Sequence, residues 1–221
     1  MSGHFPERRA VVAAVAEKIP AARGPDCVRV GIDGVDGAGK TMFAEALGSH
    51  LRACGRSVVR VGVDDFHHPR GVRYRRGRHS PEGYWLESFD YPRLRADVLT
   101  PLGPGGSRHY RAAAHDLQTD AVLDPPWQTA PTGAVLLLDG VFLHRDELHG
   151  CWDLSIWVDV PLEIATERTA RRDDTAADTT HPSLRRYVRG QQLYLAACSP
   201  RRRADVVIDN SDVERPRIVE C

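Results

Sequence analysis

The chain has 221 residues, of which 42% are hydrophobic and 27% are charged, and its formal net charge at pH 7 is zero. This composition is typical of a globular protein, and the length predicts a single α/β domain over residues 1–221. The neutral balance argues against a nucleic-acid partner and against an acidic solvating tail. No apolar run reaches membrane-spanning length, and the first residues lack a signal-peptide pattern, so we expect no membrane segment.

The cysteines and histidines point to no metal or disulfide framework. The five cysteines are odd in number and form no C-x-x-C pair, which predicts reduced thiols and a cytoplasmic location. The ten histidines show no metal-ligand spacing. Among the 30 basic residues only Lys18 and Lys40 are lysines, and the others are arginines.

The first predicted element is a helix over residues 6–19, in which alanines, valines and an isoleucine recur at helical spacing. We expect this N-terminal helix to pack against the rest of the protein without a chemical role. A turn-rich link over 20–26 leads into a buried strand over 28–33, and a helix over 42–54 follows the next loop.

The loop between this strand and helix fits the phosphate-loop pattern G-x-x-x-x-G-K-[ST]. Its glycines permit a tight bend in which successive backbone N–H groups point at phosphate oxygens. Lys40 is expected to neutralise the terminal phosphates, and Thr41 to offer its hydroxyl to Mg²⁺. The sequence therefore predicts an ATP·Mg²⁺ site formed by Gly34, Val35, Asp36, Gly37, Ala38, Gly39, Lys40 and Thr41.

A second strand, predicted over 57–63, ends in Asp64, Asp65 and Phe66. This places carboxylates at the carboxyl edge of a parallel sheet, where α/β folds bind ligands. A carboxylate helps phosphoryl transfer because it accepts the proton of the attacking hydroxyl and holds its oxygen in line with the γ-phosphate. Asp64 is the candidate general base, whereas Asp65 is expected to cap the next turn.

The next two segments have little periodicity. Residues 69–87 contain five arginines, at positions 70, 73, 75, 76 and 78, and are either a solvated, mobile loop or a flap that covers the substrate. Their aromatic residues either stack on a planar base or pack the segment against the protein. Residues 101–131 are rich in proline and glycine, which predicts a short irregular excursion.

The remaining strands complete a sheet. An almost entirely apolar strand over 134–140 carries Asp139, which is expected to supply a carboxylate to the Mg²⁺ site, with a turn role as the alternative. A strand over 156–160, a helix over 161–172, a mobile stretch over 173–182, a helix over 183–198 and a strand over 205–209 follow. This order predicts a three-layer α/β P-loop NTPase fold with a mostly parallel five-stranded sheet.

Two elements in this order resemble the uridine kinase family of P-loop nucleoside kinases. They are Asp64-Asp65-Phe66 after the glycine loop and Phe89-Asp90-Tyr91-Pro92 farther along, and the resemblance spans a core of about residues 28–210. It implies a nucleoside acceptor such as uridine or cytidine, with Asp64 as the base, Phe66 beside the acceptor and Asp90 holding the ribose hydroxyls. Tyr110 and His115 have the spacing of the family's residues near the nucleobase, although the four residues between them differ.

The resemblance also implies a helical lid at about residues 168–183, whose arginines close over the triphosphate. Arg168, Arg171 and Arg172 are the candidates, and the alternative is that they complement a helix C-terminus. Asn210 is expected near the adenine. An assembly of identical chains is compatible with the sequence.

Three alternatives stay open at this point. The first is a P-loop kinase of nicotinamide riboside, pantothenate or an antibiotic. The second is a thymidylate kinase-like enzyme, although the Asp-Arg-aromatic element of those kinases is missing. The third is a regulatory NTPase or GTPase switch, which would read guanine with an Asn-Lys-x-Asp element, whereas Asn210 is the only asparagine. Gly140 after Asp139 also argues against a motor-type ATPase, which wants a second acid there.

Overall fold

The structure is a computed structural model that describes residues 6–172 and 182–219. The expected mobile stretch and most of the expected lid therefore lie outside the described residues. In the described part, a six-stranded sheet has the order β10-β9-β8-β1-β7-β2. The strands are β1 (Val28–Gly34), β2 (Val58–Gly62), β7 (Val135–Gly140), β8 (Leu154–Asp159), β9 (Val206–Asp209) and β10 (Arg217–Val219).

Strand β1 lies in the middle of this sheet and pairs in parallel with β7 and β8. Both faces of β1 and β7 are buried along their whole length, which explains why β7 reads as an almost continuous apolar run. The sheet has one strand more than the five that the sequence predicts. Strand β10 pairs antiparallel with β9 at the sheet edge, and its three residues carry too short a pattern to be recognised from sequence.

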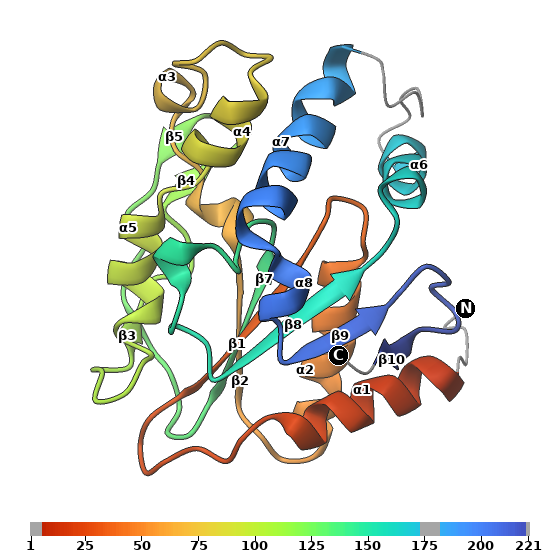
Figure 1. Cartoon of the computed structure of the whole chain (residues 1–221). Helices are drawn as coiled ribbons and strands as arrows, with labels where there is room; N and C mark the ends of the chain where they lie inside the picture. Colours follow the sequence, from red (N-terminus) through yellow and green to blue (C-terminus); the bar gives the residue numbers. More distant parts are fainter. Residues whose placement is uncertain (1–5, 173–181, 220–221) are drawn as a thin grey trace.

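Helices cover both faces of the sheet and give it three layers (Figure 1). Helix α1 (Pro6–Lys18) packs on α2 (Lys40–Ala53), and α2 lies behind the sheet in that view. Helices α7 (Pro182–Cys198) and α8 (Pro200–Arg203) lie in front, and α6 (Leu162–Arg172) stands at the side. Buried side chains from α1, α2 and the five parallel strands form one continuous core. No helix in the described ranges is long and apolar enough to cross a bilayer.

The arginine-rich segment contains regular structure that the sequence pattern did not predict. It forms α3 (Arg70–Arg73) and α4 (Pro81–Glu87), and α5 (Tyr91–Leu94) follows. The side chain of Ser80 accepts a hydrogen bond from the N–H of Gly83 and so caps the first turn of α4. Helix α4 packs along α7, as Figure 1 shows, and this contact between distant parts of the chain holds the segment.

The predicted irregular excursion contains two small antiparallel hairpins. Strand β3 (His109–Tyr110) pairs with β6 (Gln128–Thr129), and β4 (His115–Asp116) pairs with β5 (Ala121–Val122). Strands of two residues are too short to show alternation in the sequence. The described part of the chain also contains the short elements η1 (Val63–Phe66), η2 (Arg95–Leu99) and η3 (Asp146–Leu148).

Candidate active site

The loop between β1 and α2 has the backbone that a phosphate cradle needs. Gly37 and Gly39 have φ angles of 79° and 89°, in the left-handed region that favours glycine. A Cβ atom at Gly37 would lie 2.1 Å from the carbonyl oxygen of Ala165 in α6, so a larger residue has no room there. The loop ends at Lys40, where α2 begins and points its positive end back into the bend.

The base of this loop is fixed by Asp33, a residue that the sequence analysis did not single out. Its buried carboxylate accepts hydrogen bonds from the N–H groups of Leu143 and His144, both at 2.9 Å, and from the hydroxyl of Tyr194. The same hydroxyl is a donor to the carboxylate because its pKa is raised strongly by burial and by Asp33. Asp33 therefore ties the end of β1 to the segment after β7 and to α7.

Thr41 and Asp139 lie together, as their proposed roles require. The hydroxyl of Thr41 donates to Oδ2 of Asp139 at 2.7 Å, and Nη2 of Arg60 donates to Oδ1 of the same carboxylate at 2.6 Å. Arg60 belongs to β2. Its role at Asp139 was not predicted, because an arginine within a strand is usually assigned to the solvent-exposed face. With both oxygens engaged, Asp139 orients the Thr41 hydroxyl.

Lys40 is buried in the loop, and its Nζ donates to the carbonyl oxygen of Val35 at 2.8 Å. The side chain therefore arches over the loop, on the side where a terminal phosphate would lie. A bound phosphate would give the ammonium an anionic partner in place of a carbonyl.

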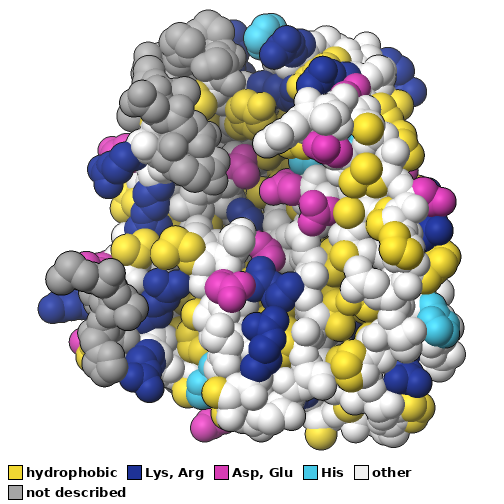
Figure 2. Space-filling view, turned by 180° about the vertical axis from the view of Figure 1, so that it is seen from behind, with side chains coloured by type: hydrophobic (Ala, Val, Ile, Leu, Met, Phe, Trp, Pro, Cys, Tyr) yellow, Lys and Arg dark blue, Asp and Glu magenta, His cyan; other side chains and the backbone are white. Residues whose placement is uncertain are grey.

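Two cavities meet at this site. The first, which we call the loop cavity, measures about 970 Å³ and is bounded by the phosphate loop, Thr41, Arg60 and Asp139. The second measures about 750 Å³ and is bounded by α3, α4 and α7; we call it the arginine cavity because Arg70, Arg73, Arg78 and Arg186 line it. Asp36, Asp64 and Thr169 line both cavities. In Figure 2, which shows the molecule from behind, acidic and basic side chains gather around a hollow near the middle of the face.

Asp64 stands where the two cavities join. It belongs to η1, directly after β2, and its carboxylate is reachable from the cavities. Burial raises its pKa, the nearby carboxylate of Asp36 adds to this rise and Lys40 opposes it, and the result is a pKa of about 6. A carboxylate of this pKa is ionised at neutral pH and basic enough to accept a proton.

Asp36 links the phosphate loop to the wall of the arginine cavity. Its Oδ2 accepts a hydrogen bond from the hydroxyl of Tyr84 at 2.7 Å, and its backbone N–H donates to Oε1 of Gln191 at 2.7 Å. Tyr84 belongs to α4 and Gln191 to α7. The phosphate-loop motif predicts only a phosphate-binding role for Asp36, because no local sequence signal shows that two distant helices contact this residue.

The expected lid arginines are partly described. Arg168 donates from Nη1 to the carbonyl oxygen of Asn210 at 3.0 Å and from Nη2 to that of Ser211 at 2.7 Å, and it lines the loop cavity together with Arg171. The side chain of Arg172 lies outside the described residues. Asn210 itself donates from Nδ2 to the carbonyl oxygen of Ala38 at 2.7 Å, so this residue reaches the phosphate loop.

The structure does not bring four predicted acceptor residues to the walls of the arginine cavity. Phe66 is fully buried in the core, and the carboxylate of Asp90 caps α5 by accepting from the N–H of Arg93 at 2.9 Å. The hydroxyl of Tyr110 donates to Oε1 of Gln128 within the β3–β6 hairpin. His115 lies behind the wall, where its Nε2 is 3.1 Å from Oδ1 of Asp120.

The residues present fit a bound ATP·Mg²⁺. The positive φ angles at Gly37 and Gly39 open the backbone to phosphate oxygens, and a Cβ atom at Gly39 would lie 2.8 Å from Nδ2 of Asn210. Mg²⁺ bound with a nucleotide keeps several waters and needs only one or two protein oxygens. Thr41 and Asp139 are placed to provide them. Within the described ranges, no group of three or more His, Cys, Asp or Glu side chains is arranged to hold a metal by itself.

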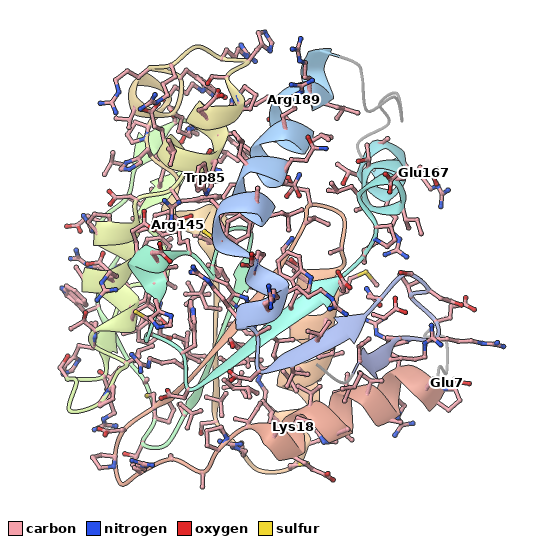
Figure 3. The ribbon with its side chains drawn as sticks, in the orientation of Figure 1. Glu7, Lys18, Trp85, Arg145, Glu167 and Arg189 are labelled. Carbon is pink, nitrogen blue, oxygen red and sulfur yellow. The ribbon has the colours of Figure 1, made fainter. Side chains whose placement is uncertain are left out.

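A contact outside the two cavities supports the end of α4. Arg145 donates from Nη1 to the carbonyl oxygen of Trp85 at 3.1 Å, and its guanidinium lies 4.4 Å from the centre of the Tyr91 ring. Figure 3 shows Trp85 and Arg145 near one another at the lower end of α4. The arginine therefore links α4 and α5 to the segment after β7.

Comparison with known proteins gives consistent likenesses. No family model matches the chain. A uridine kinase from Tolumonas auensis is 26% identical over 198 residues, covering 83% of this chain and 87% of that protein. A uridine kinase from Shewanella amazonensis is 28% identical over 158 residues, covering 66% of this chain and 69% of that protein.

Solved structures show the same fold. A possible uridine kinase from Bacillus stearothermophilus has a TM-score of 0.70 at 24% identity, covering 91% of this chain and 98% of that chain. A phosphoribulokinase from Rhodobacter spheroides has a TM-score of 0.57 at 17% identity, covering 83% and 70% of the two chains. These likenesses confirm the predicted fold class and the resemblance to uridine kinase-like P-loop kinases that the motifs indicate.

Proposed function

We propose that the chain is an ATP- and Mg²⁺-dependent kinase that transfers the γ-phosphate to a hydroxyl group of a small molecule. The observation that carries the proposal is the position of Asp64. It lies at the junction of the loop cavity and the arginine cavity, within reach of both. A carboxylate at this junction lies between a cavity for the nucleotide and a cavity for the acceptor. In-line phosphoryl transfer requires the two substrates to meet in this way.

The chain's own residues then have these roles. The loop amides from Gly34 to Thr41 and the ammonium of Lys40 hold the phosphates, because they form the concave, positively polarised end of α2. The Thr41 hydroxyl, oriented by Asp139, provides an oxygen for Mg²⁺, which when bound neutralises charge between the β- and γ-phosphates. Asp64 accepts the proton of the acceptor hydroxyl while that oxygen bonds to phosphorus and the bond to the leaving ADP oxygen breaks.

Arg168 and Arg171 are proposed to stabilise the phosphoryl group during transfer, since both line the loop cavity together with Lys40 and Thr41. Arg168 holds the carbonyl oxygens of Asn210 and Ser211 in the structure. Arg171 has no such fixed contact among the described residues and is the freer of the two to reach a phosphate. We retain Arg172 as a third candidate from its place in the sequence.

For the acceptor, the names of the two relatives support a nucleoside such as uridine, and cytidine stays a candidate from the motif resemblance. The positions of Asp90 and Tyr110 do not add to that support, because neither lines the arginine cavity. Nicotinamide riboside, pantothenate and antibiotics stay in the set of candidate acceptors for the same reason. The proposal is therefore a small-molecule kinase, with the acceptor to be found by a screen.

The experiment is an acceptor screen that measures ADP release, followed by the Asp64→Asn variant with the best acceptor. We expect turnover to fall by about a hundredfold or more, the usual contribution of a general base. ATP binding, measured by calorimetry, is expected to stay within about twofold of the wild type, because Asp64 is not part of the phosphate loop.

Glu17→Gln is the matched control, since Glu17 is an exposed carboxylate on α1. It should leave both turnover and ATP binding unchanged. Full turnover in Asp64→Asn with normal ATP binding would remove the proposed base. Release of ADP with no acceptor in the screen, at the same rate in Asp64→Asn, would instead indicate a simple ATPase.

A further inference from the structure

We propose that the acceptor of this kinase carries an anionic group, a phosphate ester or a carboxylate, which Arg73 and Arg186 bind inside the arginine cavity. The inference rests on the proposed kinase function and adds the chemical class of the acceptor. The cavity is lined by more basic than acidic side chains. Four arginines line it, whereas Asp36 and Asp64 are the carboxylates that do so among the described residues.

The guanidinium groups are crowded. Those of Arg73, Arg78 and Arg186 lie 5.3, 5.8 and 4.9 Å from the centre of one ring, that of Tyr74. Three like charges around one side chain repel each other, and the protein walls weaken the screening by water. An arrangement of this kind is stabilised when an anion enters between the groups.

The protein itself supplies little compensating charge. Nη2 of Arg73 is 3.1 Å from Oδ1 of Asp120, and Nε of Arg70 is 3.9 Å from the same oxygen. Asp120 also accepts from the N–H of Arg70 and lies beside His115, so one carboxylate serves several groups. Within the described part of the chain, no carboxylate lies within ion-pair distance of Arg78 or Arg186.

Burial makes the missing partners costly. Arg73 and Arg186 are each only 6% exposed, and each has a buried Nε with no hydrogen-bond partner among the described residues. Among the described residues, Arg186 donates a hydrogen bond from Nη1 to the carbonyl oxygen of Arg78, at 3.0 Å. A buried guanidinium with unpaired N–H donors lowers the stability of the folded protein unless a ligand accepts those hydrogen bonds.

The aromatic residues hold Arg186 in place. Its guanidinium lies 4.9, 5.5 and 5.6 Å from the ring centres of Tyr74, Tyr84 and Tyr187. Stacking of this kind fixes the plane of the guanidinium, so little side-chain entropy is lost when it forms a bidentate bond to an oxyanion. The site is therefore preorganised for a carboxylate or phosphate.

Two neighbouring arginines lie outside the cavity and have a different carboxylate partner. Arg75 and Arg76 belong to the same run, and both pair with Oε1 of Glu87, at 2.8 and 3.0 Å. Neither lines the cavity. The run thus divides into a pair outside the cavity that shares Glu87 and three arginines that line it. Of these three, Arg70 and Arg73 share Asp120, and Arg78 has no ion pair among the described residues. Arg75 therefore provides a control arginine outside the cavity.

The first test compares acceptors that differ only in the anionic group, by ADP release. The pairs are uridine 3′-phosphate with uridine, ribose 5-phosphate with ribose, D-glycerate with glycerol, and pantothenate with pantothenol. We expect the anionic member of at least one pair to have a kcat/KM about tenfold or more above its neutral partner. The phosphate pairs and the carboxylate pairs distinguish the two sources of the anion. If, in every pair that is turned over, the neutral acceptor is used as well as its anionic partner, the inference is overturned and the kinase proposal stays intact.

The second test uses variants. Arg186→Gln is expected to reduce kcat/KM for the anionic acceptor by about tenfold or more, mainly through KM, and to change that for its neutral partner by less than about twofold. Arg186→Lys keeps the charge and should recover part of the loss. Arg75→Gln should match the wild type. Equal losses for the anionic and neutral acceptors in Arg186→Gln would contradict a contact to the anion.

A binding measurement keeps the inference testable if no acceptor in the set is turned over. The wild type, saturated with Mg²⁺ and a non-hydrolysable ATP analogue that fills the phosphate loop, is titrated with inorganic phosphate while Tm is recorded. We expect a rise in Tm in the wild type and in Arg75→Gln, and none in Arg186→Gln. Identical curves for all three proteins, or no rise in any, would refute the anion site. Failure of the kinase proposal would appear separately, as no ADP release with any acceptor.

Discussion

At the scale of single residues, the chemistry depends on how opposing neighbours set the properties of Asp64. The enclosing walls and the carboxylate of Asp36 favour the protonated form, and the ammonium of Lys40 favours the ionised form. The result is a pKa of about 6, which leaves Asp64 ionised at neutral pH. Asp36 is itself held by the hydroxyl of Tyr84, whose pKa is raised well above its usual range by burial and by Asp36, so the tyrosine stays a donor.

This balance predicts the acid side of the pH profile. Only the ionised form of Asp64 can accept a proton, so kcat/KM should fall as the pH drops through about 6. In Asp36→Asn, a neighbouring negative charge is lost, the pKa of Asp64 falls and the acid limb moves to lower pH. The measurement is kcat/KM by ADP release between pH 4.5 and 8.5, taking those limits as an approximate working range.

Glu17→Gln again serves as the control, because this exposed carboxylate on α1 lies on an element that does not line either cavity. Its profile should overlay that of the wild type. An acid limb that stays near pH 6 in Asp36→Asn would show that another group controls it.

At the scale of elements, the arginine cavity exists because α7 approaches α4 closely at Gly190. A Cβ atom built on this glycine would lie 2.7 Å from Cδ1 of Tyr84 and 2.9 Å from the carbonyl oxygen of Pro81. The second of these is a backbone atom, which cannot move aside without the helix. Since Tyr84 donates to Asp36 and Gln191 follows directly on α7, this contact also positions the wall beside Asp64.

Gly190→Ala is therefore expected to destabilise the fold, although alanine is the better helix former. Overpacking of this kind costs about 1–3 kcal/mol in the free energy of unfolding, or roughly 3–10 °C in Tm for a chain of this size. Gly71→Ala in α3 is the matched control, because no atom lies within 4 Å of its added Cβ. The measurement is the Tm of both variants by thermal unfolding. Equal Tm values would show that α7 and α4 can move apart to admit the methyl group without a loss of stability.

The two sides of the site differ in how much of them the sequence predicts. The phosphate loop, the strands and Asp64 were predictable, because glycine spacing, apolar runs and strand ends are local signals. The arginine cavity was not, because Arg73 and Arg186 come from distant segments and meet only when α4 packs on α7. The positions of Tyr110 and Phe66 likewise depend on a hairpin and on core packing that no local spacing encodes. The places of the nucleotide-side residues in the fold thus follow from local signals, whereas those of the predicted acceptor residues depend on tertiary packing.

At the scale of the whole molecule, the nucleotide site joins parts of the chain that are remote in sequence. The phosphate loop contacts α6 through Ala165, the C-terminal strand region through Asn210 and α7 through Gln191. A ligand in the loop would therefore bind to an arrangement that exists only in the folded protein. Such a ligand stabilises the native state by mass action, and the gain grows with its concentration relative to Kd.

The two lysines allow a clean test of this coupling. With Mg²⁺ and a non-hydrolysable ATP analogue at about 100 times Kd, the wild type should gain about 2.7 kcal/mol in the free energy of unfolding, seen as a rise of roughly 5–10 °C in Tm. Lys40→Ala should lose most of this rise, because its ammonium is the cation expected at the terminal phosphates. Lys18→Ala removes the other lysine, an exposed residue at the end of α1, and should keep the full rise. GTP analogues, run in parallel, should give the smaller shift, since no guanine-reading element follows the loop. If Lys40→Ala and Lys18→Ala were stabilised equally, the nucleotide would have to bind elsewhere, and the roles proposed for Thr41 and Asp139 would fail with it.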